Sequence, residues 1–100
     1  MQSTPYWLID DRHGWLVVPL SVVMASGADI TCFSYVSPNG RLAYLEEDID
    51  ARAFLVTARI ERATVANWPI KRVKRAQCRR YPSFAPPEVT SLPAATLGQN

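Results

Sequence analysis

ITCFSYVSPNGRLAYLE, residues 30–46, has the pattern of a β-hairpin. Its first part is rich in β-branched and aromatic side chains, and the run after Gly40 has a similar composition. Between these runs, Pro38 presets φ, and Asn39 with Gly40 accepts left-handed backbone. The sequence therefore predicts two antiparallel strands joined by a tight turn, with the first strand over residues 30–36.

The preceding run, YWLIDDRHGWLVV, predicts another pair of strands, at residues 6–9 and 15–18. The turn between them, DDRHG, offers aspartate side chains for local capping and Gly14 for a positive φ. Pro19 suits the first turn of a helix, and Gly27 suits the end of one. A short helix is therefore expected after the second strand.

The best helix signal is EEDIDARAFLVTARIERA, residues 46–63. Asp50 is expected to cap its N-terminus. An apolar stripe at i, i+3, i+4 and i+7 predicts the face that packs on the sheet. The stripe consists of Ala51, Phe54, Leu55 and Ala58.

These elements predict one small α+β domain over residues 1–84, with a β-β-α-β-β-α order and helices on one face of an antiparallel sheet. A chain of 100 residues with 48% hydrophobic residues fits one such domain. Residues 69–81 fit either an extra C-terminal helix or an edge strand rich in Lys and Arg. Residues 85–100 contain three prolines and little periodicity, which predicts an extended or disordered tail.

Charge is distributed unevenly along the chain. Residues 1–61 carry four basic and eight acidic side chains, whereas residues 62–100 carry seven basic and one acidic. Six of the basic residues lie in PIKRVKRAQCRRYPSF, residues 69–84, which contains no acid. This asymmetry indicates either a directed electrostatic role or two halves that face each other.

The basic segment is the candidate binding site, because cations neutralise phosphates and neighbouring aromatic rings can stack on bases. The candidate residues are Trp68, Lys71, Arg72, Lys74, Arg75, Arg79, Arg80 and Tyr81. No RNP motif, helix-turn-helix or zinc finger accompanies them. The leading hypothesis is a non-enzymatic domain that binds nucleic acid or an acidic protein surface. The alternative use of the charge is a solvated face, or a strap that neutralises the acidic half.

A second hypothesis is a protein-interaction module: a homodimer, or a small inhibitor or accessory factor of a host enzyme. Its contact surface would be the apolar sheet face together with the acids of LEEDID. These acids are Glu46, Glu47, Asp48 and Asp50. They lack the spacing of a calcium-binding loop, and acids are favoured at a helix N-terminus, so no metal is expected.

A third hypothesis is an enzyme, for example a hydrolase, centred on His13 or Cys32. His13 is the only histidine, and its spacing from the candidate nucleophiles Ser34, Cys32 and Cys78 suggests no catalytic pair. No phosphate-binding glycine motif is present, so neither catalysis nor a cofactor is expected. The two cysteines form no C-x-x-C pair, which favours reduced thiols in the cytoplasm. The apolar run 15–28 is too short to span a membrane.

Three phrases, HGWLVVP, FSYVSPNGRLAYLEEDIDARAFL and RRYPSF, together resemble small uncharacterised proteins of proteobacteria. Plasmids, integrated elements or prophages encode these proteins, and the resemblance covers residues 13–84. It implies a bacterial cytosolic setting and an accessory role for a mobile element. Because the group has no assigned activity, the resemblance carries over no binding residue.

Overall fold

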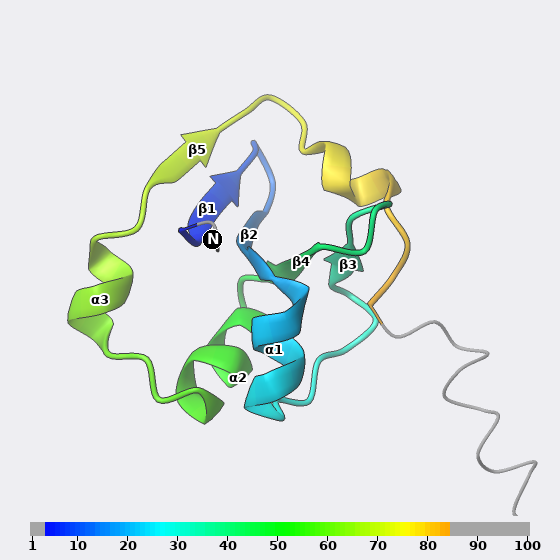
Figure 1. Ribbon diagram of the computed structural model, residues 1–100. Coiled ribbons are helices and arrows are strands. Elements are labelled where there is room, and N and C mark those ends of the chain that lie inside the picture. The colour runs from blue at the N-terminus through cyan, green and yellow to red at the C-terminus, as the bar shows by residue number, and fades with distance from the viewer. Residues whose placement is uncertain (1–3, 85–100) are drawn as a thin grey trace, which may run out of the picture.

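The computed structural model describes residues 4–84 as a five-stranded sheet with short helices packed around it (Figure 1). The strand order in the sheet is β3-β4-β2-β1-β5. The strands are β1 (Tyr6–Ile9), β2 (Gly14–Pro19), β3 (Tyr35–Val36), β4 (Leu42–Glu46) and β5 (Ile70–Arg72). The helices are α1 (Leu20–Ser26), α2 (Asp50–Thr57), α3 (Arg62–Ala66) and the 3-10 helix η1 (Gln77–Arg80).

The expected small α+β fold is confirmed, but the order of its elements differs from the expectation. The chain adds α3, β5 and η1 after α2, so the sequence of elements does not end at the predicted second helix. The sheet is mixed and not purely antiparallel, because β5 pairs parallel with β1, placing Ile70 opposite Trp7. The other neighbouring strands are antiparallel. The expected tail, residues 85–100, lies outside the described residues.

Both predicted hairpins are present, but the first strand of the second one is shorter than expected. The tight turn is confirmed: Gly40 has φ 75°, and its N–H donates to the carbonyl of Ser37 at 2.8 Å. The predicted strand over residues 30–36 is wrong before Tyr35. There the chain turns, and the side chains of Thr31 and Ser34 donate hydrogen bonds to Asp50 instead of lying along a strand.

The predicted helix over residues 46–63 is two helices in the structure. Asp50 is the first residue of α2 and does not cap it, because Ile49 occupies the N-cap position without a side-chain hydrogen bond. At the other end, Arg59 has φ 59°, a left-handed conformation that stops the helix. The chain then restarts as α3 at Arg62. The predicted apolar stripe is confirmed, because its members are buried in the first core or packed against it.

The helices α1 and α2 pack side by side against β2 and β4 and cover the first face of the sheet (Figure 1). Period-two alternation places Leu16 and Val18 of β2 on this face. Phe54 of α2 and Leu45 of β4 pack with them, and all four side chains are buried. The largest apolar cluster of the described chain therefore lies between these helices and the sheet.

The second face of the sheet is covered by residues 70–84, which we call the strap. Its β5 end pairs with β1 at one edge of the sheet, and its other end pairs with β3 at the opposite edge. There, the carbonyl of Pro82 accepts from the N–H of Val36 at 2.9 Å. Between the two edges, Ala76 and Cys78 are buried against Trp15 and neighbouring residues. Figure 1 shows the strap running from β5 through η1 toward β3.

Residues 69–81, for which the sequence allows a helix or a strand, contain a short form of each. The edge strand β5 has three exposed residues and is followed, after a turn, by η1. Residues 73–76, between these two elements, and residues 81–84, after η1, belong to no helix or named strand. The strap is therefore mostly irregular backbone.

Candidate functional site

The strap is fastened to the rest of the domain by the buried carboxylate of Asp10. Its Oδ1 accepts from the backbone N–H of Arg12 and of His13, both at 2.9 Å. Its Oδ2 accepts from the N–H of Ala76 at 3.0 Å and from Nε of Arg79 at 2.9 Å. The expectation that an aspartate caps the DDRHG turn is confirmed for Asp10, and the same side chain also holds the strap.

The ion pair between Asp10 and Arg79 is the only one among residues 4–84. The hydrogen bonds from Arg79 hold the pKa of Asp10 well below its usual range, and the carboxylate raises the pKa of Arg79. The guanidinium also lies over the ring of Trp15, 5.3 Å from its centre. Arg79 is thus fixed in position, and its charge is compensated within the domain, although its side chain remains 30% exposed.

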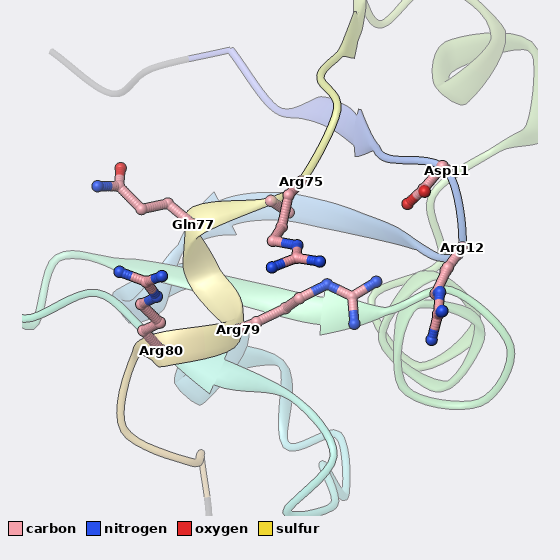
Figure 2. A pocket seen from close by; sticks show the side chains of 7 residues that line it. Asp11, Arg12, Arg75, Gln77, Arg79 and Arg80 are labelled. Carbon is pink, nitrogen blue, oxygen red and sulfur yellow. The ribbon is translucent and has the colours of Figure 1, made fainter.

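A basic cleft of about 540 Å³ opens beside Arg79. Its lining residues are Asp11, Arg12, Arg75, Ala76, Gln77, Arg79 and Arg80. In Figure 2 the guanidinium groups of Arg12, Arg75 and Arg79 gather on one side of η1. The guanidinium of Arg80 and the amide of Gln77 lie on the other side. Three guanidinium groups therefore line one cleft, together with the carboxylate of Asp11. Guanidinium groups offer the paired N–H donors that bind anions in proteins.

Arg12 is a member of the cleft that sequence reasoning missed. It lies 63 positions before Arg75 and enters from the turn between β1 and β2. No spacing in the sequence links that turn to the basic segment. The link is made by Asp10, whose carboxylate holds the turn and the strap together.

The other predicted cations do not line this cleft. Lys71 and Arg72 lie in β5 opposite Leu8 and Ile9, so their side chains project to opposite faces of the sheet edge. Lys74 is exposed in the turn that follows. The six cations of the basic segment therefore do not form one continuous row.

The two predicted aromatic anchors do not come together either. Trp68 is half-buried and packs against the first-face core, where Phe54 lies. Tyr81 packs on the second face and meets Tyr44 edge to face, with ring centres 5.3 Å apart. Each ring thus contributes to packing on a different face, and neither lines the basic cleft.

Most of the LEEDID acids bind groups of their own chain. Asp50 is fully buried and accepts from Thr31 and Ser34. Glu46 accepts from the backbone N–H groups of residues 48 and 49, both at 2.9 Å. Glu47 accepts from the N–H of Gly14 at 3.1 Å. Among residues 4–84 no group of three potential metal ligands is found.

Gly14 does not have the positive φ that the turn pattern predicts. Its role is to allow a close approach. A Cβ at this position would lie 2.8 Å from Oε1 of Glu47, inside van der Waals contact. The glycine thus leaves room for the carboxylate that binds its own N–H.

The residues considered for catalysis are placed in different environments. His13 is exposed and meets Trp15 edge to face at 6.0 Å. Burial raises the pKa of the Cys78 thiol to about 12, so this thiol is protonated at neutral pH. Ser34 is fully buried, where its hydroxyl donates to Asp50 and accepts from the N–H of Glu46 at 2.9 Å. Cys32 is exposed.

Comparison with known proteins found no matching family model, no matching curated protein and no matching solved structure. Within residues 4–84, the helices are too short to cross a membrane.

Proposed function

We propose that this protein is a non-enzymatic binding domain that holds nucleic acid along its strap, with the basic cleft as the main phosphate site. The observation that carries the proposal is that most cations of the strap are exposed and unpaired among residues 4–84. Five of them are exposed and form no ion pair with any carboxylate in the described chain: Lys71, Arg72, Lys74, Arg75 and Arg80. Their charges are available to an outside polyanion.

Counterion release supplies the driving force. Nucleic acid carries condensed cations, and each phosphate that a lysine or arginine neutralises frees them into solution. This term needs no shaped pocket, so scattered cations such as Lys71 and Arg72 can contribute to it.

The cleft adds geometry to the charge. A guanidinium presents a planar fork of donors that matches two phosphate oxygens. Arg79 is already held by Asp10 and Trp15, so little conformational freedom is lost when its remaining N–H groups bind. Arg12 and Arg75 add charge that no described carboxylate pairs. This arrangement favours, as a ligand of the cleft, a phosphate of nucleic acid over a single carboxylate on a protein surface.

The protein-interaction module has less support. Both faces of the sheet are covered, one by α1 and α2 and the other by the strap. Of the LEEDID acids, Glu46, Glu47 and Asp50 accept hydrogen bonds from their own chain. The surface that this hypothesis needs is therefore mostly occupied.

The proposed setting is the bacterial cytoplasm, with an accessory role for a mobile element. This part of the proposal depends on the resemblance of residues 13–84 and on no contact in the structure. It agrees with a domain that binds nucleic acid without catalysing a reaction on it.

The test is fluorescence anisotropy with labelled single-stranded RNA and duplex DNA at low salt. The variant Lys74→Ala/Arg75→Ala/Arg80→Ala should weaken binding by about tenfold or more, since it removes three phosphate contacts. The matched control is Arg41→Ala/Arg52→Ala/Arg62→Ala. It removes the same charge from exposed positions outside the strap, and should weaken binding by less than about threefold.

Equal losses in the two variants would show that net charge alone drives binding, and would overturn the assignment to the strap. Absence of saturable binding to either nucleic acid would overturn the proposal altogether. Equally tight binding to polyglutamate would show that the partner is an acidic protein surface and not nucleic acid.

A further inference from the structure

A second hollow, of about 310 Å³, lies next to the basic cleft and is lined mainly by aromatic and acidic side chains. Its lining residues are His13, Trp15, Phe33, Tyr35, Glu46, Asp48, Ile49 and Arg79. Arg79 lines both the hollow and the cleft, so the two sites share a wall. A ligand that fills one site is therefore adjacent to the other.

Phe33 and Ile49 are unusually exposed for large apolar residues, at 66% and 59%. Neither belongs to a core cluster. Phe33 follows the turn that Asp50 holds in place through Thr31, so its backbone is fixed even though its ring is in water. An exposed aromatic ring on a held backbone, with Arg79 lining the same hollow, can serve as a platform for an unpaired base.

We propose that the hollow takes one unpaired nucleobase, stacked on Phe33, while the neighbouring phosphates of the same strand lie in the basic cleft. This inference depends on the proposed function and narrows it to single-stranded nucleic acid. Ile49 and Tyr35 supply the remaining apolar wall, and Arg79 lies between the base and its phosphates. A base inside a duplex cannot enter, because its faces are covered by its neighbours.

The acids that line the hollow define which bases fit. A carboxylate accepts hydrogen bonds from an exocyclic amino group, as on cytosine, but meets only repulsion from the carbonyl oxygen at the same position of uracil. The carboxylate of Asp48 accepts no hydrogen bond from the described chain. Glu46 already accepts two backbone N–H groups and is held in place by them. The hollow should therefore favour cytosine over uracil.

The first experiment compares RNA homopolymers of about 12 nucleotides, oligo(C) and oligo(U), by anisotropy. Wild-type protein should bind oligo(C) about fivefold more tightly. Asp48→Ala should bring the ratio close to one, because it removes the free acceptor. Equal affinity of the wild type for the two homopolymers would overturn the proposed base selection.

The second experiment tests stacking itself. Phe33→Ala should weaken binding of oligo(C) by about tenfold and leave duplex DNA binding unchanged, whereas Phe33→Trp should restore it. Met24→Ala is the matched control, because Met24 is equally exposed, at 64%, on α1 away from the hollow. A 2-aminopurine base in the oligonucleotide should lose fluorescence on binding to the wild type and not to Phe33→Ala.

These outcomes separate the two proposals. If neither RNA nor DNA binds, the proposed function fails and this inference fails with it. If both bind with the expected dependence on the strap cations but Phe33→Ala behaves as wild type, only the base site is overturned.

Discussion

Asp10 accepts hydrogen bonds from Nε and Nη2 of Arg79, at 2.9 and 3.2 Å, although the two residues lie 69 positions apart in the chain. The same carboxylate binds the N–H of Ala76. The first turn of the domain and its last helix are therefore joined at one side chain. Because the strap otherwise crosses the sheet as irregular backbone, its course depends on this contact.

The first prediction concerns Asp10→Asn. An amide cannot accept the same set of five hydrogen bonds, so we expect the free energy of unfolding at neutral pH to fall by about 2 kcal/mol. Urea denaturation followed by tryptophan fluorescence measures it. Asp11→Asn is the matched control, because Asp11 is exposed and should change stability by less than about 0.5 kcal/mol. Equal effects of the two changes would contradict the role given to Asp10.

The same contact predicts how stability depends on pH. The pKa of Asp10 is held below its ordinary value in the folded protein, chiefly by Arg79, so the unfolded chain takes up a proton more readily as the pH falls. The stabilisation is complete above about pH 5 and is lost progressively below it. Wild type should therefore lose its advantage over Asp10→Asn in acid. A constant difference between the two proteins from neutral to acid pH would contradict the ion pair.

The second prediction concerns the buried carboxylate of Asp50. Asp50→Ala leaves the hydroxyls of Thr31 and Ser34 without their acceptor, and should lower the free energy of unfolding by about 3 kcal/mol. Asp48→Ala removes the same charge from an exposed site nearby and should cost less than about 0.5 kcal/mol. Chemical denaturation of both variants checks this. The account of the turn at residues 31–34 is wrong if Asp50→Ala is as stable as Asp48→Ala.

The third prediction concerns the two thiols. Cys32 is exposed, whereas Cys78 is buried with a raised pKa. Ellman's reagent at about pH 8 should therefore label one thiol per folded chain quickly and the second only on unfolding in urea. Cys32→Ser should remove the fast phase. Rapid labelling of both thiols in the native protein would mean that the strap does not stay closed over the second face.

Local sequence signals were sufficient where structure is decided locally. Pro19 and Gly27 bracket α1, and the SPNG turn joins β3 to β4, as the sequence predicts. In the same way, the apolar stripe of α2 identified the face that meets the sheet. These features depend on residues within a few positions of one another, so propensity and periodicity describe them well.

Two of the misses have causes that no local sequence signal shows. The strand expected over residues 30–36 is cut short because Thr31 and Ser34 bind Asp50, a residue that the sequence assigned to a helix cap. The helix expected to reach residue 63 ends early because Arg59 adopts a left-handed conformation with no glycine to signal it. Neither event leaves a local pattern.

The candidate site was predicted only in part. The basic segment was identified, and its cations are mostly exposed. Arg12 could not be found, because only the fold brings it to Arg75. Trp68 and Tyr81 were chosen as neighbours of the cations in sequence, yet the strap turns their rings to different faces. Closeness in sequence to the cations therefore did not place these two rings on the surface where the cations lie.

The most direct test of the central claim is the salt dependence of single-stranded RNA binding between about 50 and 200 mM KCl. Three or four phosphate contacts predict a slope of log K against log salt of about −2 to −3. The double variant Arg12→Ala/Arg75→Ala should make that slope less steep by about 1.4, the share of two contacts. A slope near zero for the wild type, or the same slope in the double variant, would contradict the claim that the strap and its cleft bind phosphates.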